Sequence, residues 1–177
     1  MRVVFDTCVL VPSFLREVLL ACAAVGQIDY IVSSQILTEW IRAAKNPLDQ
    51  LEASLAVAQF RKTHALAIRP GAPSLTQFWL PDPNDIHVLG LAVVQDASVI
   101  LTHNKKDFPK SVLLTYDIKV LDPDEFLRKL LKQNLNEIQS ALNPIVGRVR
   151  ASHTEMNMAE IWKKAWLPQF GHLIERL

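Results

Sequence analysis

Five oxygen-bearing side chains could do chemistry together, because each lies beside an expected strand end or helix start. They are four acids and one amide: Asp6, Glu39, Asp85, Asn104 and Asp107. In an open parallel sheet, ligands bind beyond the carboxyl ends of the strands, where one crevice could collect these groups. A bare carboxylate cluster repels itself, and hard divalent cations such as Mg²⁺ or Mn²⁺ neutralise it. Metals held in this way activate a water and stabilise the charge that develops in an in-line phosphoryl displacement.

Each of these residues also has a structural explanation when taken singly. Asp6 could cap a helix that follows a strand, and Asp82 is a good N-cap ahead of Pro83. Glu39 could line the edge of a buried helix face, and residues 104–107 could form an ordinary polar turn. The spacing is therefore compatible with a shared site but does not prove one.

Hydroxyl and basic side chains near the acids are candidates for binding substrate. Thr7 and Thr102 could bond a carboxylate, a water or a phosphate, or equally cap a helix or end a strand. Lys105 and Lys106 would lie beside the acids and could contact a phosphate-bearing substrate, although solvated surface charge is the default role of lysine. All four are weaker candidates than the acids.

Apolar periodicity predicts the elements that position these residues. Strands are expected at 3–5, 30–32, 98–102 and 118–121. Helices are expected from 9 to about 25 with Gly26 as C-cap, from 34 to before 46, over 51–66, and from 82 to about 94. A loop is expected over 69–77, and a further helix from Asp122 or Asp124. Strands that alternate with helices predict an α/β fold with a mostly parallel sheet covered on both faces.

The composition changes near Leu127. An amphipathic helix is expected over Arg128–Leu142, a linker with Pro144 over Asn143–Ser152, and short helical pieces over 155–165 and 168–177. We predict a catalytic domain over residues 1–127 and a helical C-terminal extension over residues 128–177.

Composition and charge limit the classes of protein to which this chain could belong. The 177 residues are 50% hydrophobic and 21% charged with five glycines, which suits a compact domain with a buried core. The net charge of +1 neither requires nor excludes RNA, because carboxylates that hold cations offset the lysines. No apolar run approaches the roughly 18 residues of a membrane span, and Asp6 interrupts any signal-peptide core. Cys8 and Cys22 lack zinc or disulfide spacing, so we expect free thiols in a cytoplasmic protein without membrane contact.

Taken together, the motifs resemble the PIN-domain family. Residues 3–10, VVFDTCVL, resemble its opening strand and first aspartate, and residues 37–39, LTE, resemble the glutamate on its second helix. The runs 82–89, DPNDIHVL, and 99–109, VILTHNKKDFP, are similar to the subgroup with an asparagine followed three residues later by an aspartate. Residues 121–127, LDPDEFL, resemble the closing strand and helix.

The resemblance implies a three-layer α/β/α fold and a divalent-metal-dependent endoribonuclease that uses Mg²⁺ or Mn²⁺. It implies that Asp6, Glu39, Asp85 and Asp107 are catalytic and metal-binding, and that Asn104 is a neutral metal ligand. Many such proteins are VapC-like toxins, so the implied partners are an RNA substrate and a small antitoxin protein, with a homodimer as a further expectation. Asn104 departs from the many members that carry an acid there, and an amide is a weaker ligand for a hard cation.

Two other functions compete with this interpretation. A phosphatase of the haloacid-dehalogenase type also has an aspartate after its first strand, but it needs a second aspartate two positions on, where Cys8 stands. A degenerate PIN domain that binds RNA or a protein without cutting is the stronger rival, because Asn104 replaces an acid. His87 and His103 could act as general bases, but a metal-bound water does not require one.

Overall fold

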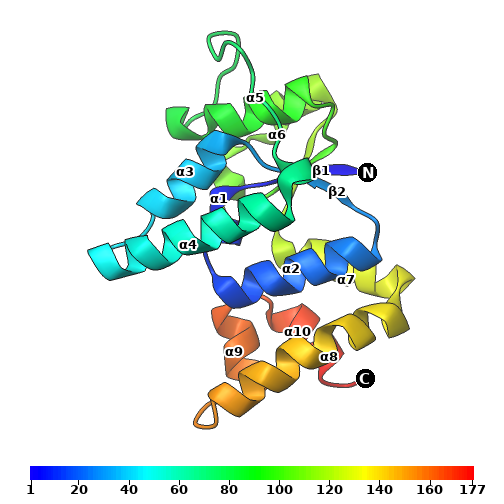
Figure 1. Ribbon diagram of the computed structural model, residues 1–177. Coiled ribbons are helices and arrows are strands. Elements are labelled where there is room, and N and C mark those ends of the chain that lie inside the picture. The colour runs from blue at the N-terminus through cyan, green and yellow to red at the C-terminus, as the bar shows by residue number, and fades with distance from the viewer. The chain divides into compact units, whose positions relative to one another are not determined.

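The computed structural model describes residues 1–177, which form two compact units. The first unit comprises Met1–Val11 and Asp29–Leu121, and the second comprises Pro12–Ile28 and Asp122–Leu177. Figure 1 labels their helices and strands. The division into a domain over residues 1–127 and an extension over residues 128–177 stays a prediction.

The first unit is built on a four-stranded, all-parallel sheet in the order β2-β1-β3-β4. The strands are β1 (Arg2–Phe5), β2 (Asp29–Ile31), β3 (Val99–Leu101) and β4 (Lys119–Leu121). The apolar run in β1 is fully buried, as expected for a parallel strand at the centre of a sheet. The chain therefore has an α/β fold of the three-layer α/β/α type, as predicted.

Five α-helices and four short 3₁₀ turns complete the first unit. The helices are α1 (Thr7–Leu10), α3 (Ser34–Arg42), α4 (Pro47–Thr63), α5 (Ile86–Val94) and α6 (Lys110–Leu113). The 3₁₀ turns are η1 (Ala65–Ala67), η2 (Pro83–Asp85), η3 (Lys105–Asp107) and η4 (Leu114–Tyr116). α5 packs on β1 and β3, while α3 packs against α1 and α4, beside which it lies in Figure 1. These contacts bring the start of α3 and the start of α5 to the sheet.

Two helix boundaries differ from the prediction. The helix expected from residue 9 to 25 is interrupted at Pro12, whose ψ of 117° is extended and whose ring nitrogen has no hydrogen to donate. α1 ends before it, and α2 (Ser13–Val25) begins after it, with Gly26 as its C-cap as predicted. α4 begins at Pro47 instead of 51, because Asn46 caps it by accepting a hydrogen bond of 2.9 Å from the backbone of Asp49.

The second unit is entirely helical. It comprises α2, α7 (Pro123–Gln133), α8 (Leu135–Ser152), α9 (Met158–Lys164) and α10 (Pro168–Ile174). Asp122 caps α7, so the first of the two expected starts is right. No helix of the chain, α8 with its 18 residues included, is both long and apolar enough to span a bilayer.

The linker predicted over Asn143–Ser152 is wrong, because these residues continue α8 through Pro144. Buried Ile138, Leu142 and Val146 recur every four residues, and this apolar stripe packs against α2. Proline removes one hydrogen bond from a helix interior, and the packing of the stripe offsets that loss. The break lies instead at Asn134, where the expected helix over 128–142 divides into α7 and α8.

An aromatic cluster fills the second unit. The ring of Trp162 lies 4.8 Å from that of Phe14 and 5.8 Å from that of Phe170. Buried Asp124 accepts a hydrogen bond of 2.9 Å from the backbone of Phe170, and so caps the start of α10. Gly171 is packed so closely that an added Cβ would lie 2.2 Å from Cγ of Trp162.

We predict opposite effects of alanine at two helical glycines. Gly171→Ala should lower the free energy of unfolding by about 1–3 kcal/mol, because the added methyl group overlaps Trp162. Gly147→Ala in α8 meets no atom within 4 Å and should raise it by about 0.5–1 kcal/mol. Urea unfolding followed by tryptophan fluorescence measures both, and a shift of the same sign in the two variants would contradict this packing.

Candidate active site

The site begins at the carboxyl ends of β1 and β3, which pair with Phe5 opposite Leu101. Asp6 and Thr102 are the next residues of the two strands. The chain goes from β1 to its neighbour β2 on one side and from β3 to β4 on the other, so the strand order reverses between β1 and β3. Such a switch point leaves a crevice beyond the strand ends, which is where α/β proteins bind ligands.

Three donors hold the buried carboxylate of Asp6. Its Oδ1 accepts from the backbone N–H of Thr7 at 2.6 Å, and its Oδ2 accepts from Oγ1 of Thr102 at 2.7 Å and from Sγ of Cys8 at 3.2 Å. Burial, together with the charge of Asp6, raises the pKa of Cys8 to about 12, so the thiol keeps its proton and can donate it. The N-cap role and the candidate catalytic position of Asp6 therefore coexist.

Three further carboxylates gather nearby. One oxygen from each of Asp82, Asp85 and Asp107 can be chosen so that all three lie within 4.8 Å of one another. Burial, followed by the charges of Asp6, Asp82 and Asp107, raises the pKa of Asp85 to about 6. Acids from three separate segments of the chain thus act electrostatically on Asp85.

Asn104 bridges two of these acids as a donor. Its Nδ2 donates to Oδ2 of Asp107 and, at 3.4 Å, to Oδ2 of Asp85. Its backbone N–H donates to Oγ1 of Thr102 at 3.0 Å. An amide N–H between two carboxylates reduces their mutual repulsion, which a fifth acid at this position would increase.

Glu39 belongs to a separate hydrogen-bonded pair at the side of the site. Its Oε1 lies 2.7 Å from Nε2 of His87, and its Oε2 accepts from Oγ1 of Thr7 at 2.9 Å. Burial is the largest single influence on the pKa of Glu39 and raises it, but the hydrogen bond and charge of His87, with the hydrogen bonds from Thr7 and Gln35, together lower it. Glu39 is therefore held as an ionised carboxylate in a fixed direction.

The structure connects most of the predicted residues through shared contacts. Asp6, Asp85, Asn104 and Asp107 interact as described, Thr102 links Asp6 to Asn104, and Thr7 links Asp6 to Glu39. Glu39 is not one of the three clustered carboxylates. Lys105 and Lys106 are exposed in η3, between Asn104 and Asp107.

Two residues have parts in this arrangement that sequence reasoning did not predict. Asp82 does cap η2, accepting from the backbone of Asn84 at 2.9 Å, but it also joins the three-carboxylate cluster. The sequence did indicate this second role, because Asp82 stands three residues before Asp85. Residues with this spacing lie on the same side of a 3₁₀ turn. His87 orients Glu39, and no spacing along the chain indicates a contact between residues so far apart.

Comparison with known proteins decides the family. The sequence profile of the PIN domain matches residues 2–106, more than half of the chain. The chain belongs to the PIN-domain family. This PIN-domain chain is also 54% identical over 43 residues to the "Putative ribonuclease VapC50" of Mycobacterium tuberculosis. The match covers 24% of the chain and 25% of that relative, and no solved structure gives a significant match.

We predict that Asp85→Asn stabilises the metal-free PIN domain at neutral pH. The folded protein holds the Asp85 proton more tightly than the unfolded chain does, since the pKa rises from 3.8 to about 6. The free energy of unfolding of the wild type therefore decreases as pH rises through this window. The variant has no carboxyl group at this position, so its free energy of unfolding does not show this decrease. The gain should be absent below about pH 4 and reach about 1 kcal/mol at pH 7.5, allowing for solvent screening.

Urea unfolding in EDTA at both pH values measures the effect. Glu52→Gln, at an exposed position of α4, removes one negative charge outside the cluster and controls for net charge. A pH-independent effect of Asp85→Asn, or an equal gain in the control, would mean that the carboxylates do not repel one another.

Proposed function

We propose that this PIN-domain chain is an endoribonuclease that depends on Mg²⁺ or Mn²⁺ and hydrolyses RNA phosphodiester bonds. The observation that carries the proposal is the gathering of Asp82, Asp85 and Asp107 next to Asp6 at the switch point of the sheet. Structural caps explain Asp6 and Asp82 singly. Caps do not explain why three acids lie close enough to a fourth, Asp85, to add to the effect of burial in raising its pKa.

The donor set fits a hard divalent cation. Carboxylate oxygens are the ligands that Mg²⁺ and Mn²⁺ prefer, and the raised pKa of Asp85 marks a local excess of negative charge. Asp85 and Asp107 would hold the ion with Asp6 and Asp82, while Asn104 and Glu39 stay predicted ligands. Bound there, Mg²⁺ or Mn²⁺ would supply an activated water and neutralise charge on the phosphodiester.

The chain's own residues keep the acids in place. Thr7, Cys8 and Thr102 fix the direction of Asp6 through hydrogen bonds to both of its oxygens. His87 holds Glu39 in its ionised form. Basic side chains next to a carboxylate site attract RNA phosphates, and Lys105 and Lys106 in η3 are proposed for this role.

We further propose that the protein is the toxin of a type II toxin–antitoxin pair, with a small antitoxin protein as partner. The support is the similarity of 43 residues to a protein named as a VapC ribonuclease. An adjacent reading frame for a small DNA-binding protein would support this partnership, and co-purification of the two products as one complex would test it. A homodimer stays a prediction.

A second candidate function is favoured by Asn104. Its Nδ2, an atom that cannot bind a cation, faces both Asp85 and Asp107. A PIN domain whose amide satisfies its own acids could bind RNA or a protein without cutting. Metal binding separates this candidate from the nuclease.

We predict that Mn²⁺ raises the melting temperature of the wild type and not of Asp6→Asn or Asp85→Asn. An ion that binds only the folded protein stabilises it in proportion to its occupancy, and each variant removes one ligand charge. Scanning fluorimetry with Mn²⁺ against EDTA measures the shift, with Glu52→Gln as a control that should behave as the wild type. Equal shifts in all four proteins would place the ion elsewhere.

We also predict cleavage of single-stranded RNA by the wild type only with a divalent cation. Asp6→Asn should lower the rate by at least about 100-fold, because it removes a charge from the ion's site, whereas Glu52→Gln should not change it. Gel analysis of an end-labelled RNA measures both. Cleavage in EDTA that survives Asp6→Asn would remove the proposed mechanism, and metal binding without any cleavage would favour the binding module.

A further inference from the structure

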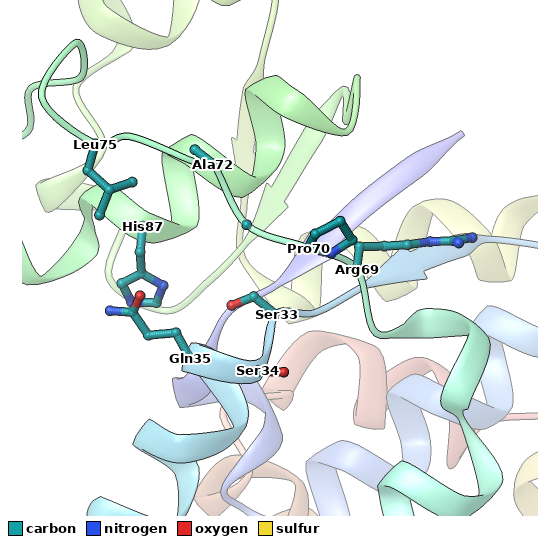
Figure 2. A pocket seen from close by; sticks show the side chains of 9 residues that line it. Ser33, Ser34, Gln35, Arg69, Pro70, Ala72, Leu75 and His87 are labelled. Atoms are coloured by element: carbon teal, nitrogen blue, oxygen red, sulfur yellow. The ribbon is translucent and has the colours of Figure 1, made fainter.

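A cavity of about 190 Å³ lies in the first unit, and the ring of His87 lines it. Nε2 of the same ring contacts Glu39, so a single imidazole ring lies between Glu39 and the cavity. Figure 2 shows its two walls. One is polar and carries Ser33, Gln35 and His87, and the other is the loop that carries Pro70, Ala72 and Leu75. The Arg69 guanidinium points away from the His87 ring in this view.

The polar wall contains a buried nitrogen without a partner. His87 is 5% exposed, and its Nδ1 has no hydrogen-bond partner. A carboxylate only accepts hydrogen bonds, so Nε2 donates to Glu39, and Nδ1 is the ring nitrogen left to pair with a ligand. Buried polar atoms in proteins almost always have a partner, so this nitrogen points to a ligand with a polar atom.

Donors lie on the same wall at the start of α3. The Oγ of Ser33 accepts from the backbone of Ile36 at 3.2 Å, which leaves its hydroxyl hydrogen available to a ligand. The N–H groups of Ser34 and Gln35, in the first turn of the helix, have no acceptor within it. The wall therefore offers several polar atoms to one edge of a ligand.

Apart from Arg69 at its start, the loop wall is apolar, and it is held in place. Leu75 is 36% exposed, and Ala72 and Pro70 line the cavity beside it. Gly90 of α5 allows this close packing, because a Cβ there would lie 2.9 Å from Leu75 and 3.0 Å from Ala72. A phosphate would leave the apolar wall unused, and a ribose is polar on every side.

We infer that this cavity binds a nucleobase, with the apolar wall against its face and the polar wall along its hydrogen-bonding edge. The inference rests on the proposed action on RNA, whose unstacked bases proteins recognise in this way. Because His87 touches both the cavity and Glu39, a base bound here would lie one imidazole ring away from Glu39 and would select which nucleotide is presented for cleavage.

The test is a titration with the four nucleoside 5′-monophosphates in EDTA, followed by ¹⁵N NMR. At least one nucleotide should shift the backbone amides of Ser34 and Gln35 and the His87 ring nitrogens saturably, and ribose 5-phosphate, which lacks the base, should not. Gly71→Leu should weaken binding at least about tenfold, because Gly71 lines the cavity and its Cβ position is open. Gly147→Leu, at an equally open glycine that does not line it, should leave binding unchanged.

Three results would overturn the inference: no shift with any nucleotide, as expected if water alone fills the cavity; equal shifts with ribose 5-phosphate; or equal affinity of the two glycine variants. EDTA removes the divalent cations that the proposed nuclease needs, so nucleotide binding is measured independently of RNA cleavage. Nucleotide binding without metal-dependent cleavage would support the cavity and remove the proposed nuclease, and cleavage without nucleotide binding would do the reverse.

Discussion

Repulsion among carboxylates is the constraint on which the rest of this structure depends. The parallel pairing of β1 and β3 brings Asp6 to the switch point, and η2 and η3 bring Asp82, Asp85 and Asp107 close to one another. Burial, followed by the charges of the other three acids, raises the pKa of Asp85. Like charges at such separations destabilise a fold unless donors or cations offset them. An arrangement that is costly for stability is most readily explained by function.

Neutral donors surround the acids and determine their directions. Thr102 donates to Asp6 and accepts from the backbone of Asn104, so one buried hydroxyl joins the ends of the site. The Asn104 amide separates Asp85 from Asp107. His87 extends the network by holding Glu39 and lining the neighbouring cavity. Glu39 and the cavity thus share a single buried imidazole.

The sequence predicted the strands and most helices because their apolar patterns are local, and it predicted the neighbourhood of Asp6, Asp85 and Asp107 because parallel strands end at one edge. It did not predict that α8 continues through Pro144, since that depends on packing against α2, which local propensity does not contain. Asp82 was explained as a cap, and the structure adds a second role that a single-residue argument could not reveal. The pairing of Glu39 with His87 depends on how α3 and α5 are placed in three dimensions.

The central claim is that these acids form one divalent-cation site in a PIN domain. Crystals of the wild type soaked in Mn²⁺, with data collected for the anomalous signal of manganese, test it most directly. The account predicts an anomalous peak in contact with the carboxylates of Asp85 and Asp107, lost in crystals of Asp85→Asn. Well-ordered acids with no peak among them at millimolar Mn²⁺, or a peak that persists unchanged in the variant, would contradict it.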